Sequence, residues 1–214
     1  MGVLTHVRKL VEDALNHYAQ PTTQIIALIE SARAILNLRE ICTTAPSRLS
    51  GLIFAAEDFA LDVGLERTPS LLEMLYARQS IVVAAVAHSL SAIDLVCTDY
   101  KDTSGQGALA RECQDGVTMG FTGKQVIHPT QVEVVQRMFS PSESKVNWAV
   151  RILVANEKAV TDGRGAWTLD GKMIDAPVIK MAEKLVGFFL YHIQVKKLVR
   201  LTCLNRCNGR SLRV

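Results

Sequence analysis

The sequence lacks the long apolar run that a membrane-spanning helix needs. No apolar run reaches the roughly 18 residues required to cross a bilayer, and the first stretch, MGVLTHVRKLVEDAL, has no apolar core of the kind found in signal peptides. Apolar residues recur there at helical spacing, which predicts an amphipathic helix over residues 4–15. We therefore expect no membrane partner.

Cysteine is sparse and forms no recognisable framework. The five cysteines are scattered and odd in number, which is typical of a reducing compartment rather than of a disulfide-rich secreted domain. Cys203 and Cys207 form a C-x-x-x-C pair with no second pair nearby. Because a structural zinc site needs four ligands, this pair argues against zinc.

A strong charge of either sign is absent from most of the chain. The formal net charge is +3, but residues 187–214 contain six basic residues and no acidic one. Without these six of the 24 basic residues, 18 remain against 21 acidic residues, so the rest of the chain carries −3. We therefore expect no nucleic-acid partner for the body, and only the tail is basic.

Apolar segments alternate with helical ones along the first two thirds of the chain. The helical patterns cover residues 31–41 and 70–90, with Ser31 as a candidate cap for the first. The apolar, strand-like runs cover residues 23–30, 49–58, 92–100 and 123–129. Continuously apolar strands that alternate with helices predict an α/β fold with a parallel sheet covered by helices.

The pattern after residue 129 is helical and is interrupted once. Residues 161–179 contain Gly163, Gly165 and Gly171, which favour a tight turn. We expect a small hairpin at this point, followed by a helix.

Three of the predicted strands deliver an acid near their carboxyl ends. These acids are Glu30, Asp58 and Asp99. Active sites of parallel α/β folds are built at the carboxyl ends of the strands. Crowded carboxylates would repel one another and lose hydration unless a cation holds them, and hard oxygen ligands suit Mg²⁺.

An alternative is that each acid caps the helix that follows it. Glu30 precedes SARAIL, and Asp58 precedes FALDVG. Two acids at successive strand ends favour a site over two caps. Since side chains alternate along a strand, we expect the neighbouring Glu57 to point away from Asp58.

Two further residues have competing interpretations. His128, just before Pro129, is either a core histidine or a residue that meets substrate at a strand end. Asp175, before Pro177, would normally be a turn residue.

Four segments, taken together and in order, resemble one family. IIALIESARAILN, LIFAAEDFALDVG, AIDLVCTDYKD with GFTGKQVIHPTQV, and GKMIDAPVI are similar to the citrate lyase β-subunit-like branch of the HpcH/HpaI aldolase superfamily. This branch includes citramalyl-CoA, malyl-CoA and β-methylmalyl-CoA lyases. The resemblance extends from about residue 4 to residue 184.

The resemblance implies a TIM-type (β/α)8 barrel, usually trimeric, with one Mg²⁺ per site. It assigns Glu30 and Asp58 to the metal, and Ile127 and His128 to the acyl-CoA substrate. Asp175 would be the catalytic acid, brought over the site of a neighbouring subunit. The implied reaction is the cleavage of a 3-hydroxyacyl-CoA to acetyl-CoA and a 2-oxo acid.

The chain departs from the family pattern at both ends. The family's opening strands, with YVPG-like and PKV-like motifs, have no counterpart here. We therefore expect a partial TIM barrel, roughly its last four β/α units, over residues 1–160, a hairpin and helix over 161–186, and a basic non-family tail over 187–214. The alternatives are a catalytically inactive fragment with a binding or assembly role, and a malate-synthase-like condensing enzyme. The relatives imply a mitochondrial location, although the targeting N-terminus is not in this chain.

Overall fold

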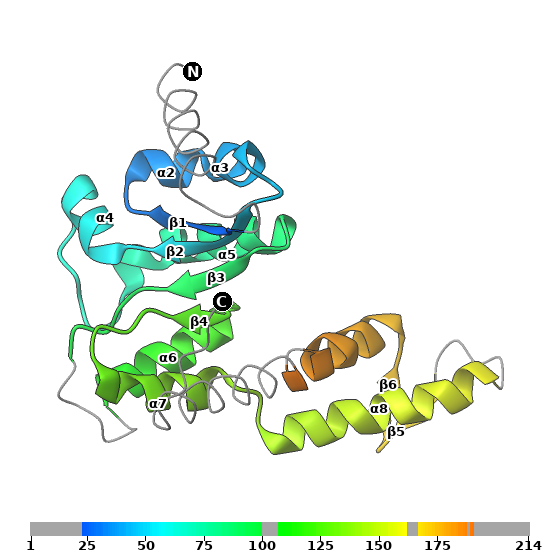
Figure 1. Ribbon diagram of the computed structural model, residues 1–214. Coiled ribbons are helices and arrows are strands. Elements are labelled where there is room, and N and C mark those ends of the chain that lie inside the picture. Colours follow the sequence, from blue (N-terminus) through cyan, green and yellow to red (C-terminus); the bar gives the residue numbers. More distant parts are fainter. Residues whose placement is uncertain (1–22, 100–106, 162–166, 188, 191–214) are drawn as a thin grey trace, which may run out of the picture. The chain divides into compact units, whose positions relative to one another are not determined.

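The computed structural model describes residues 23–99, 107–161, 167–187 and 189–190 (Figure 1). The predicted helix at 4–15, the Cys203–Cys207 pair and residues 191–214 of the basic tail lie outside these ranges. The chain divides into two compact units, residues 1–139 and 140–214. Within the described ranges, no helix has the length and apolar character needed to cross a membrane.

A four-stranded parallel sheet forms the centre of the first unit. Its strand order is β1-β2-β3-β4, so each strand pairs with the next one in sequence. The register places Ile29 opposite Phe54 and Asp94 opposite Lys124. The strands are β1 (Ile25–Ile29), β2 (Leu49–Phe54), β3 (Ser91–Asp94) and β4 (Gly123–Lys124). The predicted α/β class with a parallel sheet is confirmed.

Helices connect the strands, as the alternation predicted (Figure 1). The single helix predicted over residues 31–41 is divided at Asn37, which ends one helix and begins the next. The helical elements are α2 (Ala32–Leu36), α3 (Leu38–Thr44), α4 (Ala56–Val63), the 3-10 turn η1 (Leu72–Met74), α5 (Leu75–Ala87), α6 (Ala108–Met119) and α7 (Pro129–Phe139).

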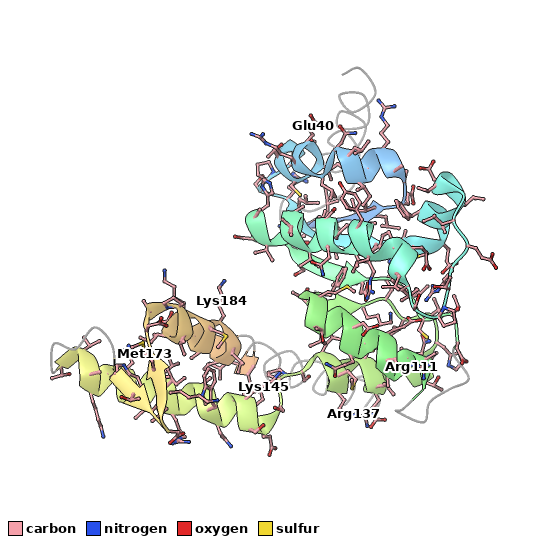
Figure 2. The ribbon with its side chains drawn as sticks, turned by 180° about the vertical axis from the view of Figure 1, so that it is seen from behind. Glu40, Arg111, Arg137, Lys145, Met173 and Lys184 are labelled. Atoms are coloured by element: carbon pink, nitrogen blue, oxygen red, sulfur yellow. The ribbon has the colours of Figure 1, made fainter. Side chains whose placement is uncertain are left out.

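The core of this unit includes residues of the parallel strands. Ile29, Leu52 and Phe54 are fully buried, whereas Ile26 and Leu28 of β1 are 48% and 55% exposed and alternate with the less exposed Ile25 and Ala27. Most charged side chains of these helices are exposed, although Arg78 of α5 is fully buried. Figure 2 shows this for Glu40 of α3 and Arg137 of α7.

The second strand ends earlier than the sequence predicted. β2 stops at Phe54, and the amide of Ala55 makes its last sheet-like bond, to the Ile29 carbonyl at 3.0 Å. Glu57 and Asp58 therefore lie in the first turn of α4, not on the strand. The prediction for Glu57 assumed that Glu57 and Asp58 lie on a strand, and this premise was wrong. Successive side chains of a helix diverge by about 100° and do not alternate between two faces.

The third and fourth strands are also shorter than predicted. β3 ends at Asp94, five residues before Asp99, and β4 ends at Lys124, four residues before His128. The amide of Gln125 bonds the Asp94 carbonyl at 3.0 Å, and beyond this point the two segments no longer form a ladder. Asp99 and His128 thus lie on loops and helix starts beyond the sheet.

The second unit contains a long helix, a hairpin and a closing helical segment. α8 (Glu143–Thr161) precedes the antiparallel strands β5 (Trp167–Leu169) and β6 (Lys172–Ile174), and residues 176–187 are helical. The turn residues Asp170 and Gly171 have φ values of 50° and 74°, as a tight hairpin turn of the right twist requires. The predicted hairpin is confirmed.

Candidate metal and substrate site

Glu30 and Asp58 lie at the carboxyl edge of two neighbouring strands. Glu30 directly follows β1, and Asp58 is the third residue of α4, which begins at once after β2. The bond between Ala55 and Ile29 holds the two strand ends together. Both carboxylates are exposed to solvent.

Neither acid is the cap of its helix, so the capping alternative is wrong. Ser31 caps α2, because its Oγ accepts a hydrogen bond from the amide of Ala34 at 3.2 Å, as the sequence predicted. The start of α2 also contacts the carboxylate of Asp62, whose Oδ2 accepts a hydrogen bond from the amide of Ala32 at 2.8 Å. The N-cap residue of α4 is Ala55, which has no capping side chain.

The direction of α4 places Asp58 on the side of the helix that faces the end of β1. Asp58 and Asp62 are four residues apart, so they lie on one face of the helix, about 6 Å apart along its axis. Asp62 reaches Ala32, two residues after Glu30. Asp58 therefore projects from the helix face that contacts the segment carrying Glu30.

This donor set fits a hydrated divalent cation. Within the described residues, no hydrogen bond or ion pair engages the carboxylate of Glu30 or Asp58. That part of the chain also contains no group of three or more His, Cys, Asp or Glu side chains placed to hold a metal. Mg²⁺ is commonly bound by one or two carboxylates and keeps several waters, which two exposed carboxylates allow.

Glu57, next to Asp58, is engaged in a chain of ion pairs. Its carboxylate binds the Arg67 guanidinium, whose Nη2 lies 2.9 Å from Glu112 Oε1, and Glu112 Oε2 lies 2.8 Å from Lys124 Nζ. Burial acts to lower the pKa of Arg67, but the carboxylates of Glu112 and Glu57 outweigh it, so the pKa lies above its ordinary value. Glu57 is thus paired with Arg67, and Asp58 is the carboxylate of this turn that is open to a cation.

The backbone that continues from β3 is held by side chains from β4, from α7 and from the loop after α4. Three successive carbonyls, of residues 95–97, each accept a hydrogen bond from a side chain. The bonds are Lys124 Nζ to Leu95 O at 2.7 Å, Arg67 Nη2 to Val96 O at 3.0 Å and Gln131 Nε2 to Cys97 O at 2.9 Å. Sequence reasoning missed these residues, since the donors are 29 to 34 positions away from their acceptors.

Ile127 and His128 are exposed and lie immediately before α7, which begins at Pro129. The Ile127 side chain is 56% exposed, and its amide donates to Gln131 Oε1 at 3.0 Å. The His128 ring lies at the helix start, where its Nδ1 accepts a bond from the amide of Thr130 at 3.3 Å and lies 2.8 Å from Thr130 Oγ1. His128 is exposed, so the core-histidine alternative is wrong.

Asp175 begins the helical segment 176–187 of the second unit. Its Oδ1 accepts a bond from the amide of Val178 at 3.2 Å, and its carbonyl accepts one from Ile179 at 3.0 Å. The residue is thus a helix cap rather than the turn residue that its sequence context suggested. Its catalytic role stays a prediction.

A buried ion pair between α5 and the end of β3 was not predicted. Arg78 of α5 and Asp94 of β3 are both fully buried, with Nε to Oδ1 at 3.0 Å and Nη2 to Oδ2 at 2.6 Å. The guanidinium carbon lies 5.7 Å from the centre of the Phe121 ring. An acid within the apolar run AIDLV was the available signal, because a buried carboxylate requires a partner.

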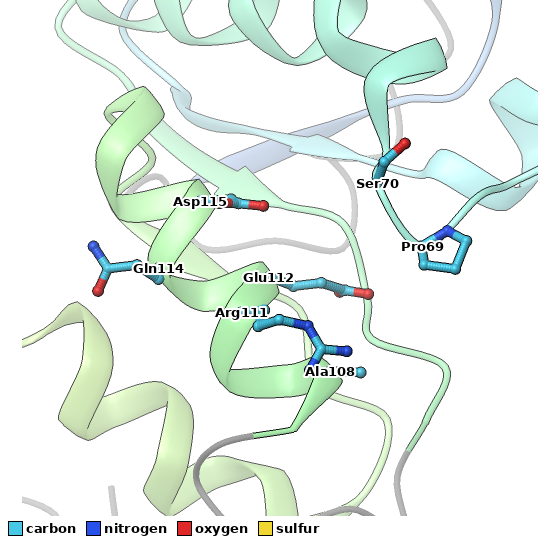
Figure 3. A pocket seen from close by; sticks show the side chains of 7 residues that line it. All are labelled: Pro69, Ser70, Ala108, Arg111, Glu112, Gln114 and Asp115. Atoms are coloured by element: carbon cyan, nitrogen blue, oxygen red, sulfur yellow. The ribbon is translucent and has the colours of Figure 1, made fainter.

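A separate cavity of about 280 Å³ lies beside α6 (Figure 3). In Figure 3, Glu112 projects from α6 towards the segment that carries Pro69 and Ser70. None of the predicted site residues lines this cavity. Its lining residues are Pro69, Ser70, Ala108, Arg111, Glu112, Gln114 and Asp115.

The chain resembles known proteins over most of its length. It is 42% identical over 169 residues to the human mitochondrial citramalyl-CoA lyase, which covers 76% of this chain and 49% of that protein. It is 35% identical over 187 residues to the citrate lyase subunit beta of Leuconostoc mesenteroides, covering 86% of this chain and 61% of that one. The chain thus spans about half the length of the mitochondrial relative.

Solved structures give the same result. The structure of CitE from Mycobacterium tuberculosis, in complex with magnesium, acetoacetate and coenzyme A, aligns with a TM-score of 0.65 and 29% identity, over 88% of this chain and 74% of that one. The model of the HpcH/HpaI aldolase/citrate lyase family matches residues 5–129. The chain therefore belongs to the HpcH/HpaI aldolase/citrate lyase family.

Proposed function

We propose that this chain carries the Mg²⁺ site of a carbon–carbon lyase that cleaves a 3-hydroxyacyl-CoA, such as citramalyl-CoA or malyl-CoA, to acetyl-CoA and a 2-oxo acid. The observation that carries the proposal is the pair of exposed carboxylates of Glu30 and Asp58 after adjacent strands, which have no hydrogen-bond or ion-pair partner among the described residues. The human relative is named as a citramalyl-CoA lyase, and the CitE structure holds magnesium and coenzyme A, which supports the metal and the substrate class.

The residues have separable tasks in this reaction. Cleavage breaks the carbon–carbon bond β to the thioester carbonyl: the substrate hydroxyl loses its proton as the keto group forms, and the thioester enolate gains a proton at carbon. A Mg²⁺ ion held by Glu30 and Asp58 would stabilise the negative charge on the hydroxy-acid part. Ile127 and His128 would lie against the acyl-CoA, and Asp175 would hold the proton that reaches the acetyl-CoA methyl carbon.

The proposal includes the architecture and assembly that such a site needs. We infer that the parallel sheet of β1 to β4 is the last half of a (β/α)8 barrel over residues 1–160, with a hairpin and helix at 161–186 and a tail at 187–214. A homotrimer would let Asp175 act on the site of a neighbouring subunit. A mitochondrial location is supported by the names of the human and rodent relatives.

Metal binding tests the proposal directly. In isothermal titration with MgCl2, the Glu30→Gln and Asp58→Asn variants should each bind Mg²⁺ at least about tenfold more weakly than the unsubstituted protein, since each removes half of the protein ligands. Glu133→Gln is the matched control, because Glu133 is an exposed acid on α7. Unchanged Mg²⁺ affinity in both site variants would refute the assignment.

The reaction itself is tested with citramalyl-CoA and malyl-CoA, following acetyl-CoA by chromatography. The malate-synthase-like alternative predicts condensation instead of cleavage. With acetyl-CoA and a 2-oxo acid supplied, it would release free coenzyme A, which a thiol reagent detects.

A second candidate, from a different class, is a catalytically inactive chain with a binding or assembly role. The observation that favours it is the sheet itself, whose outer strands are β1 and β4 and whose Ile26 and Leu28 are about half exposed. Parallel sheets are usually covered on both faces. Size-exclusion chromatography with circular dichroism decides: a compact, cooperatively unfolding monomer would contradict an assembly role.

A further inference from the structure

The geometry points to Gln131 as a positioning residue for the Ile127–His128 segment. We propose that its side-chain amide fixes this segment against the end of β3, and thereby sets the surface against which the acyl-CoA lies. This inference rests on the proposed function, which assigns the substrate contact to Ile127 and His128.

The Gln131 side chain joins two segments that are distant in sequence. It is 1% exposed, donates from Nε2 to the Cys97 carbonyl at 2.9 Å and accepts at Oε1 from the Ile127 amide at 3.0 Å. A carbonyl can only accept and an amide N–H can only donate, so the two partners fix which end of the Gln131 amide is oxygen. Both bonds therefore require a carboxamide at this position.

The backbone of Gln131 holds the next residue of the same segment. Its amide donates to the His128 carbonyl at 3.0 Å. Gln131 thus contacts Ile127 through its side chain and His128 through its main chain. The side chain of Ile127 is 56% exposed, so the segment presents an exposed surface on a fixed backbone.

The Cys97 end of this link is also fixed. The two carbonyls before Cys97 are held by Lys124 and Arg67, which are themselves joined through Glu112. The position of Ile127 is therefore set by the end of β3 and not by α7 alone. A binding surface held in this way loses little conformational freedom when a ligand binds.

Three variants test the inference. Gln131→Met keeps a similar volume and removes both side-chain bonds, whereas an ionised glutamate in Gln131→Glu keeps the acceptor for Ile127 and has no donor for Cys97. Gln114→Met is the matched control, because Gln114 is an exposed glutamine on α6. Amide exchange at Ile127 is followed by NMR, and acetyl-CoA and MgCl2 are titrated by calorimetry.

We expect Ile127 to exchange about tenfold faster in Gln131→Met, since one hydrogen bond is lost, and to stay protected in Gln131→Glu. Acetyl-CoA should bind about fivefold more weakly to Gln131→Met, while Mg²⁺ affinity stays unchanged because Glu30 and Asp58 are not touched. The Gln114→Met control should match the unsubstituted protein in every measurement. A loss of global stability alone would not separate the two ligands in this way.

Unchanged exchange at Ile127, or unchanged acetyl-CoA affinity in Gln131→Met, would overturn the positioning role. If Gln131→Met does not fold, Gln131→Glu decides the question, because it lacks the hydrogen bond to the Cys97 carbonyl. An acetyl-CoA affinity equal to that of the unsubstituted protein would then contradict the link to β3. Absence of acetyl-CoA binding by the unsubstituted protein would refute the proposed function instead, and the exchange measurement would still judge the contact between Gln131 and Ile127.

Discussion

Replacing Arg78 by methionine should destabilise the first unit strongly. Arg78 and Asp94 are both fully buried, and two hydrogen bonds of 3.0 Å and 2.6 Å join them. The variant would leave the Asp94 carboxylate in the core without its cation. Gly116 lies so close that a Cβ at that position would be 2.7 Å from Asp94 Oδ2, which leaves little room for a compensating shift of the carboxylate towards α6.

Removing one partner of a buried pair costs about 3–5 kcal/mol of unfolding free energy, mostly because the other charge is stranded. With a urea dependence of about 2 kcal/mol per molar, the unfolding midpoint should fall by about 2 M. The double variant Arg78→Met with Asp94→Val removes both charges, so it should lose less stability than Arg78→Met alone.

Urea unfolding followed by circular dichroism measures this effect. Trp148 and Trp167 both belong to residues 140–214, so tryptophan fluorescence does not report on the pair directly. Arg137→Met, an exposed arginine of α7 (Figure 2), is the control and should change stability by no more than about 0.5 kcal/mol. A loss below about 1 kcal/mol for Arg78→Met would match an exposed ion pair and would refute the reasoning.

Two further predictions concern Cys113 and Asp175. Burial of the thiol, opposed in part by the nearby Lys124, raises the pKa of Cys113 to about 11. Folding therefore favours the neutral thiol, and this contribution to stability is complete below pH 9 and is lost as the pH rises from 9 to 11. Over that pH range the unfolding free energy should fall less in Cys113→Ala than in the unsubstituted protein. An equal fall in both proteins would contradict the raised pKa. Asp175→Asn should preserve the cap on Val178, because asparagine caps as well as aspartate, so the circular dichroism spectrum should be unchanged. Under the proposed function, this variant should also keep Mg²⁺ binding and lose most of the lyase turnover. If the proposed homotrimer forms, mixing Asp175→Asn with Asp58→Ala should restore part of the activity, and no recovery despite confirmed subunit exchange would exclude a cross-subunit role.

The elements of the fold could be predicted from local sequence because their causes are local. The apolar runs contain β1, β2 and β3, the first of them rich in β-branched residues, and Ser31 caps α2 as its position indicated. The hairpin follows from Asp170-Gly171, where the turn needs positive φ values. The same local reasoning placed Glu30 at a strand end and recognised the motif around Asp58.

Tertiary structure decided where the strands end and which acids remain open. A strand ends where its neighbour stops pairing, and the periodicity of one segment does not contain that information. Asp58 therefore lies on α4 rather than on β2, and Asp99 lies beyond β3. Asp94, within the same apolar run, went unnoticed because its partner Arg78 comes from another element.

The side chains that hold the site region together also belong to the tertiary structure. Gln131, Arg67 and Lys124 bind carbonyls about 30 positions away in the chain. Neither composition nor spacing indicates such pairings, because a backbone carbonyl has no residue-specific signature in sequence. The sequence by itself determined which carboxylates we propose for a cation and which segment we propose for an acyl-CoA. Packing decided which carboxylates stay exposed, since burial and partners depend on segments that meet only in the folded chain.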